Sequence, residues 1–179
     1  MDFSIPMTEY DAASAEVRAR YDAQIAAHGR ITNMKRTLLH SVKAFDVYME
    51  WYPLADLLKE FLGSRAVSLY AYAISSGNRC LVCGTFFRKI LIDAGDDPDH
   101  PVLSPEEELL MDLGFSIAED PHHINPAIYD ELRRRYSDEQ IVLLFSFAGI
   151  MAATNLFNTV AKVPLDEVLY EYRNTKKRE

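Results

Sequence analysis

The chain has 179 residues, of which 49% are hydrophobic and 26% are charged, a composition typical of globular proteins. This length suits one core, so we expect residues 1–179 to form a single domain. Acidic residues outnumber basic ones by 27 to 19, giving a formal net charge of -8 at pH 7. No basic stripe appears beyond the short tail Lys176-Lys177-Arg178, so no nucleic-acid partner is expected.

The two cysteines form one C-x-x-C motif, Cys80-Leu81-Val82-Cys83. The N-terminus lacks the basic start and apolar core of a secretory signal, so we expect a cytoplasmic protein. In a reducing compartment this spacing indicates redox chemistry or metal binding more than a structural disulfide. Zinc is the weaker alternative, because a closed site needs four ligands and the adjacent His122-His123 lacks a ligand spacing. We expect no metal and no cofactor.

Helical periodicity dominates the first third of the chain. Residues 8–28 are rich in helix-forming residues with apolar side chains every four positions, and Gly29 ends this predicted helix. Residues 35–62 also have a helical rhythm, although Pro53 removes a backbone donor and is expected to kink or divide the segment. Gly63 marks the end of that segment.

The cysteines follow a predicted helix and a turn. Residues 64–76 are expected to form a buried helix that starts at Ser64 and ends at the turn Gly77-Asn78. A second helix is expected over about 79–94. Its apolar stripe consists of Cys80, Cys83, Phe87 and Leu91.

Capping signals mark the helices of the second half. Ser104-Pro105-Glu106-Glu107 starts a predicted helix that runs to about Ile117, and Asn125-Pro126 starts a short one. Ser137-Asp138-Glu139-Gln140 is a second capping box, and it precedes the apolar segment 141–163. No strand pattern flanked by turns occurs, so the sequence predicts an all-α bundle.

The segment 141–163 is long enough to raise the question of a membrane span, since about 20 apolar residues can cross a bilayer. We expect no membrane association, because polar side chains interrupt its second half and are costly in lipid. This segment and the aromatic-rich region 45–62 offer more apolar surface than one small bundle hides, which predicts a homo-oligomer. The polar residues are Thr154, Asn155, Asn158, Thr159 and Lys162.

The position of the cysteines at a helix start bears on their reactivity. If Asn78 caps the helix, Cys80 lies in its first turn, where unpaired backbone N–H groups lower a thiol pKa. Three residues separate the two cysteines, so both sulfurs share a face and can form a disulfide. The alternative is that both are small hydrophobic core residues, since they are flanked by Leu81, Val82 and Phe87.

The segment Ser68–Cys83 (SLYAYAISSGNRCLVC) resembles the helix-turn-helix core of the carboxymuconolactone decarboxylase and alkylhydroperoxidase D family. Gly29–Ser41 is similar to the segment before the family's first core helix. Ser137–Lys162, with Asn155-Leu156-Phe157-Asn158, resembles its last long helix. The resemblance covers about 28–170. It implies an alkylhydroperoxidase D-like helical bundle that assembles as a homotrimer or homohexamer.

The resemblance also implies roles for the cysteines. In the peroxidase branch the second cysteine attacks the peroxide and becomes a sulfenic acid, which the first cysteine converts to a disulfide. By this likeness Cys83 would be the nucleophile and Cys80 the resolving thiol. The motif of that branch also contains a glutamate and two histidines, of which the glutamate and the last histidine relay protons. Ser68 stands at the glutamate position, and Val82 and Phe87 stand at the histidine positions. The usual relay is therefore absent. This matters because a general base typically contributes a factor of about 10² to 10⁴ to the reaction rate.

Ser68, Tyr72 and Ser75 form a polar stripe at helical spacing on an otherwise apolar segment. If this face meets the cysteines, these side chains support a thiolate or a bound substrate. The alternative for Tyr72 is a helix contact in which its hydroxyl is already hydrogen-bonded. Phe87 would pack against the thiols and oppose their ionisation.

The main functional hypothesis is a thiol-dependent oxidoreductase that uses the C-x-x-C as a redox pair. Peroxidase or disulfide activity is expected to be weak or altered, and the reductant would be a dithiol such as a lipoyl protein or thioredoxin. Two alternatives stay open at this point. One is an enzyme similar to carboxymuconolactone decarboxylase acting on a small organic acid, and the other is a non-catalytic helical oligomer.

Overall fold

The structure, a computed structural model, describes residues 3–174, so the basic tail at 176–178 lies outside the described residues. This part of the chain contains helices and no strand, as the sequence predicted. The elements are α1 (Ala15–His28), α2 (Asn33–Leu38), α3 (Val42–Met49), α4 (Trp51–Leu62), α5 (Ser64–Gly77), α6 (Leu81–Asp93), α7 (Pro105–Glu119), α8 (Pro126–Arg135), α9 (Asp138–Val160) and the 3-10 helix η1 (Glu167–Tyr172).

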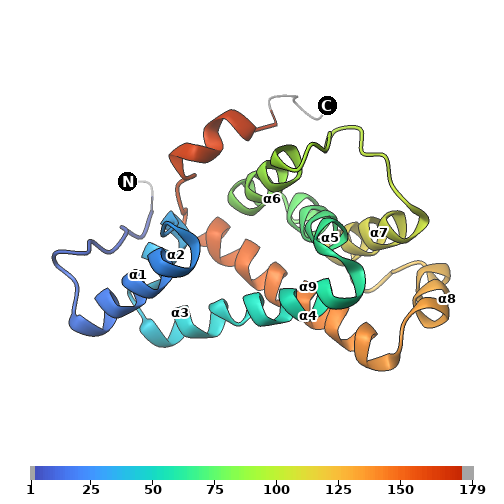
Figure 1. Cartoon of the computed structure of the whole chain (residues 1–179), viewed down its shortest axis with the longest axis horizontal. Coiled ribbons are helices and arrows are strands. Elements are labelled where there is room, and N and C mark those ends of the chain that lie inside the picture. Colours follow the sequence, from blue (N-terminus) through green and yellow to red (C-terminus); the bar gives the residue numbers. More distant parts are fainter. Residues whose placement is uncertain (1–2, 175–179) are drawn as a thin grey trace.

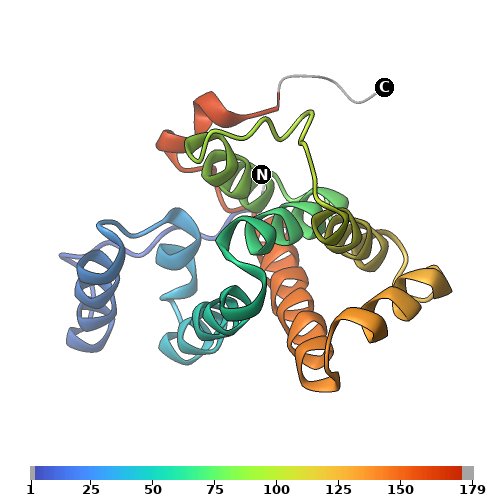
Figure 2. The same ribbon diagram turned by 45° about the vertical axis from the view of Figure 1, so that its right-hand side comes forward.

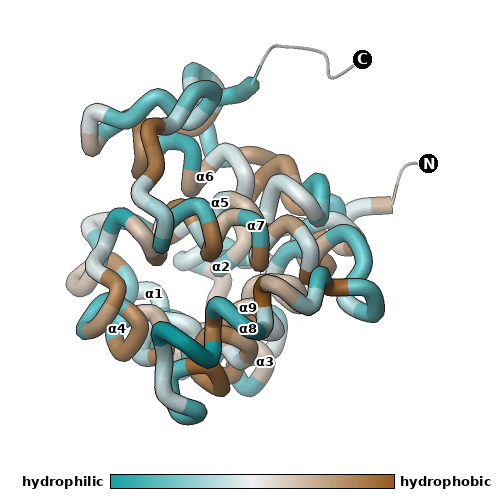
Figure 3. The backbone as a smooth tube through the Cα atoms, turned by 90° about the vertical axis from the view of Figure 1, so that its right-hand side faces the viewer, coloured by the Kyte–Doolittle hydropathy of each residue, from teal (hydrophilic) through white to brown (hydrophobic). Residues whose placement is uncertain are grey.

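Helix α5 is the centre of the packing. It contacts α4, α6, α7 and α9, and most of its side chains are buried. Helix α9 runs through the middle of the molecule, while α1 and α8 lie at opposite ends of its long axis (Figures 1 and 2). Hydrophobic and hydrophilic stretches alternate along most helices, as expected for elements that bury one face (Figure 3).

Small residues allow α5 and α7 to pack closely. A Cβ added at Gly114 in α7 would lie 2.9 Å from the Cβ of Ala73 and 3.1 Å from the backbone oxygen of Tyr70. At the other end of the same contact, a Cβ added at Gly77 would lie 2.7 Å from the Cβ of Ala118. This contact fixes the end of α5, from which the chain turns into the C-x-x-C.

The prediction of a helix from residue 8 was wrong at its start, because α1 begins at Ala15 with Ser14 as its N-cap. Contacts with α1 and α2 hold the preceding segment in a non-helical form. The Thr8 hydroxyl donates to the backbone oxygen of Arg36 at 2.8 Å, and the Tyr21 hydroxyl donates to the backbone oxygen of Thr8 at 2.5 Å. These contacts between distant residues outweigh the local helix propensity.

The segment 35–62 is divided, but not at Pro53. It forms α2, α3 and α4, with breaks after Leu38 and Met49. Pro53 lies in the first turn of α4, where its missing N–H has no intrahelical acceptor to lose. The predicted capping boxes at Ser104 and Ser137 are both present. The short η1 helix after α9 was not predicted.

Among the described residues, α9 is long and apolar enough to cross a membrane by length and composition alone. In the structure, however, it is a packing partner of α4, α5 and α6. Leu144, Phe147 and Met151 on its inner face are at most 3% exposed. One face of α9 is therefore part of the core.

The close contact between α5 and α7 predicts that Gly114→Ala destabilises the protein by about 1–3 kcal/mol, because the added methyl overlaps buried atoms. Gly84→Ala is the matched control, since its Cβ would meet only the Ser76 hydroxyl at 3.9 Å. This control should be stabilising by about 0.5–1 kcal/mol. Urea denaturation of both variants measures the difference, and equal midpoints would contradict the proposed overlap.

Candidate functional site

A tight turn between α5 and α6 positions the cysteines. Asn78 ends α5, and Arg79 has a left-handed backbone with φ 55°. The backbone N–H of Cys80 then donates to the backbone oxygen of Ser75 at 3.0 Å. As a result Cys80 is itself the N-cap of α6. The prediction that Asn78 caps this helix, with Cys80 inside its first turn, was therefore wrong.

The Cys80 sulfur acts as the cap acceptor, because the backbone N–H of Cys83 points at it over 3.5 Å. Both residues are free thiols and both are buried. A hydrogen bond from the Cys83 thiol lowers the pKa of Cys80 to about 7; burial opposes this shift, and the backbone N–H groups of Cys83 and Val82 add to it. The hydrogen bond to Cys80, reinforced by burial, raises the pKa of Cys83. Near neutral pH, the negative charge of the pair therefore sits on Cys80.

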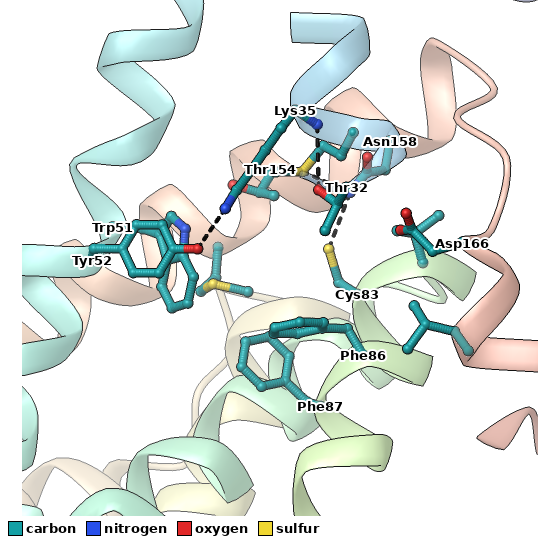
Figure 4. Close-up of a pocket in the computed structure, with 14 residues that line it drawn as sticks. Thr32, Lys35, Trp51, Tyr52, Cys83, Phe86, Phe87, Thr154, Asn158 and Asp166 are labelled. Carbon is teal, nitrogen blue, oxygen red and sulfur yellow. Dashed lines mark hydrogen bonds between the residues drawn. The ribbon is translucent and has the colours of Figure 1, made fainter. Parts of the chain in front are cut away.

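Cys83 faces a largely apolar cavity of about 70 Å³, here called the Cys83 cavity (Figure 4). Trp51 of α4 and Phe86 and Phe87 of α6 form much of its apolar wall. Polar side chains enter it from four elements or their caps, namely Thr32, Lys35, Tyr52, Thr154, Asn158 and Asp166.

Asn158 of α9 holds the Cys83 sulfur in place. Its side-chain N–H donates to Cys83 Sγ at 3.2 Å and lies 3.3 Å from Met34 Sδ. This hydrogen bond favours the Cys83 thiolate, although the thiol of Cys80 and burial act more strongly in the opposite direction. The Asn158 Oδ1 atom is buried without a hydrogen-bond partner among the described residues.

Lys35 of α2 is the buried cation of the Cys83 cavity. Its side-chain nitrogen donates to Gln24 Oε1 at 2.5 Å and to the Tyr52 hydroxyl at 2.7 Å. Burial, together with the nearby charge of Arg30, lowers the pKa of Lys35 to about 8, and Asp166 opposes this shift. Burial also raises the pKa of Tyr52 to about 12, so Tyr52 is a neutral phenol at physiological pH.

Cys80 faces a second and more open cavity of about 370 Å³, here called the Cys80 cavity. Tyr72, Arg79 and Arg88 contribute to its polar lining. Arg88 forms a bidentate ion pair with Asp99 at 2.7 and 2.8 Å, and it also interacts with the Tyr72 hydroxyl. The two cavities share no lining residue, so each thiol has separate surroundings.

The structure divides the predicted site residues between the two cavities. Phe87 lines the Cys83 cavity, whereas Tyr72 and Ser75 line the Cys80 cavity. Ser68 lines neither of them, and its hydroxyl donates to the backbone oxygen of Ser64 on the same helix at 2.9 Å. The hydroxyl of Ser75 is buried and has no hydrogen-bond partner within residues 3–174.

Sequence reasoning did not select Lys35, Tyr52 or Asn158 as site residues. One signal was available for Lys35, since helical spacing places it on the same face as Leu38 and Leu39, which are both buried. A cation on an apolar helix face indicates a buried, functional or paired group.

No family model and no curated protein matches the sequence. Solved structures do match the fold. An uncharacterized peroxidase-related protein from Silicibacter sp. TM1040 has a TM-score of 0.78 at 16% identity, covering 94% of each chain. An alkylhydroperoxidase AhpD core protein from Ralstonia eutropha JMP134, also an uncharacterized peroxidase-related protein, has a TM-score of 0.73 at 18% identity, covering 98% of this chain and 100% of the other.

The chain has the alkylhydroperoxidase D-like fold. The debrominase Bmp8 shares it: a cysteine-to-alanine variant in complex with 2,3,4-tribromopyrrole has a TM-score of 0.79 at 15% identity, covering 96% of both chains. The fold predicted from the resemblance is therefore confirmed. Within this alkylhydroperoxidase D-like bundle, the C-x-x-C lies where α5, α6 and α9 meet.

The N-cap position of Cys80 predicts that thiol alkylation by iodoacetamide rises with pH around a midpoint near 7. Below this pH the pair is fully protonated; above it the thiolate is present. Cys80→Ser should lower the alkylation rate at pH 7 by about tenfold or more, because a thiolate of pKa near 7 is lost. Cys83→Ser should keep a reactive Cys80, with a somewhat higher midpoint. Mass spectrometry measures the alkylation of each variant. A wild-type midpoint near pH 9 would contradict the assignment of the thiolate to Cys80.

Proposed function

We propose that the protein is a thiol-dependent oxidoreductase that reduces a small hydroperoxide with Cys83 and Cys80. The observation that carries this proposal is the contact between two thiols at the start of α6, each facing a different cavity. Peroxidase-related proteins among the structures with this fold support it. The Cys83 cavity would bind the peroxide, because it is the more enclosed and more apolar of the two.

The Cys80 thiolate supplies the base that the missing side-chain relay does not. It takes the proton of Cys83, with which it is in hydrogen-bond contact. The Cys83 thiolate then attacks the terminal peroxide oxygen, the O–O bond breaks, and the organic part leaves as an alcohol after protonation. The Cys80 thiol next attacks the Cys83 sulfenic acid, forming a disulfide and releasing water. One hydroperoxide and two thiols thus give one alcohol, one water and one disulfide.

An external dithiol would regenerate the pair through the Cys80 cavity. Its thiolate attacks the Cys80 sulfur, Cys83 leaves as a thiolate, and the second thiol of the reductant closes its own disulfide. A lipoyl protein or a thioredoxin-like protein has this chemistry. The Cys80 cavity is the larger and more open one, which suits access by such a group. We place this cycle in the cytoplasm, where such reductants keep thiols reduced.

Cavity size favours a hydroperoxide of few atoms over a halogenated ring. An apolar cavity of about 150 Å³ in another protein accommodates benzene. The Cys83 cavity, at about 70 Å³, is smaller, whereas a ring with three bromine atoms is larger than benzene. The ligand reported for the debrominase with this fold is therefore a poor match for the Cys83 cavity in its present shape.

Treatment of the reduced protein with one equivalent of hydrogen peroxide or tert-butyl hydroperoxide should convert both thiols to one intramolecular disulfide. Cys80→Ser lacks both the base and the resolving thiol, so it should react more slowly with the peroxide and stop at a sulfenic acid on Cys83, which dimedone traps and mass spectrometry locates. Cys83→Ser serves as the control and should form no intramolecular disulfide. Thiols that stay unmodified in the folded wild-type protein would reject the proposal and favour a non-catalytic oligomer.

We also propose that the protein is a homotrimer or homohexamer that associates through the outer face of α9. Four large apolar side chains on this face are exposed, Val142 (60%), Phe145 (38%), Leu156 (65%) and Val160 (61%). Gly149 lies between them, and a Cβ added there meets nothing within 4 Å, so a second helix has room to approach. A helix face this apolar is typical of a subunit contact.

Sedimentation analysis should give a mass of three or six times the 20.4 kDa chain. Leu156→Glu should shift the protein towards the monomer, because a charge would be buried in the contact. Val102→Glu is the matched control, since Val102 is 89% exposed and lies outside this face. A monomeric wild-type protein would remove this proposal without affecting the one on the thiols.

A further inference from the structure

Lys35 is a buried cation that the proposed thiol chemistry does not use. It is 4% exposed and extends from α2 towards Tyr52 across the wall of the cavity that contains Cys83 (Figure 4). Between residues 3 and 174 no carboxylate forms an ion pair with it. Buried lysines usually have such a partner, so its absence calls for an explanation.

Lys35 and Tyr52 each keep one hydrogen-bond donor that is not used within the described residues. An ammonium group has three N–H donors, and Lys35 uses two of them on Gln24 and Tyr52. The Tyr52 hydroxyl accepts one of these hydrogen bonds, so its own O–H has no acceptor among the described residues. The third N–H of Lys35 and the O–H of Tyr52 therefore lie 2.7 Å apart at their heavy atoms, on one wall of the Cys83 cavity.

Burying this ammonium group opposes folding. Burial lowers the pKa of Lys35 to about 8, so the side chain is still mostly charged at pH 7. Such groups concentrate at functional sites, where ligand binding compensates for the loss of hydration. Asp166, the acidic residue of the cavity, accepts the backbone N–H of Asn33 at 2.9 Å and lies near Arg30 and Arg36. Asp166 therefore interacts with Lys35 only at a distance: it opposes the effect of burial on the pKa of Lys35 without forming an ion pair with it.

We propose that Lys35 and Tyr52 bind the anionic oxygen of a small monocarboxylate whose hydrocarbon part lies against the aromatic wall of the Cys83 cavity. The carboxylate would accept one hydrogen bond from each residue, and its charge would be neutralised by Lys35. Trp51, Phe86 and Phe87 would contact its carbon atoms. The volume of about 70 Å³ restricts this ligand to a few carbons.

This inference rests on the proposed function in one respect only. If Cys83 reduces hydroperoxides, the preferred substrate is one that carries a carboxylate, because Lys35 and Tyr52 then hold its acidic end in the cavity that contains the sulfur. Binding of the carboxylate itself requires no redox step, so the two proposals can fail separately.

The test uses the reduced full-length protein with acetate, propionate and butyrate, and their neutral amides as comparison ligands. The carboxylates should raise the melting temperature, whereas the amides should not. Lys35→Met should weaken carboxylate binding by about tenfold or more, and Tyr52→Phe by a smaller factor. Lys59→Met is the matched control, because Lys59 is an exposed lysine paired with Asp56, and it should leave binding unchanged.

The outcomes separate the two proposals. Equal carboxylate binding by wild-type, Lys35→Met and Tyr52→Phe proteins would overturn the site, as would the absence of any effect on the wild type. If Lys35→Met does not fold, Tyr52→Phe decides the matter alone. Carboxylate binding without peroxide-driven disulfide formation would keep the site and reject the peroxidase. In an active enzyme, Lys35→Met should raise KM for a carboxylated hydroperoxide by a larger factor than KM for tert-butyl hydroperoxide.

Discussion

The hydrogen bonds at the start of α6 determine where the charge of the cysteine pair lies. The left-handed backbone of Arg79 turns the chain so that the Cys80 sulfur, not a conventional cap side chain, accepts the backbone N–H of Cys83. An anion at this position is favoured by the helix dipole and by unpaired N–H groups. The Cys83 thiol, together with these backbone N–H groups, thus supplies the stabilisation that neighbouring basic side chains often give to a reactive thiol.

The fold gives the two sulfurs different environments although they are three residues apart. The Cys83 cavity is formed by α2, α4, α6, α9 and the segment that leads into η1, which are far apart in the sequence. The Cys80 cavity is formed by α5, α6 and the turn between them, together with Asn174. The first is mainly apolar with a buried lysine, and the second is the more polar of the two and contains two arginines. The two cavities are therefore suited to binding different molecules.

Helices with local end signals were predictable, and contacts between distant residues were not. The capping boxes at Ser104 and Ser137 marked α7 and α9 correctly, because both partners of each box lie within four residues. The start of α1 was not predictable, since Thr8 is held by Tyr21 and Arg36. Local preference favours asparagine as an N-cap, so the role of Cys80 was hidden until the turn at Arg79 was known.

The candidate site was predictable only in its centre. The C-x-x-C spacing identified Cys80 and Cys83, and the resemblance placed them at a helix start. Lys35 and Tyr52 come from separate helices, and no spacing rule brings them together with Cys83. Because the two cavities share no lining residue, an oxidant at one thiol and a reductant at the other need not compete. In steady-state turnover the peroxide and the reductant would then not inhibit each other. The alcohol would not have to leave the Cys83 cavity before the reductant binds at the Cys80 cavity.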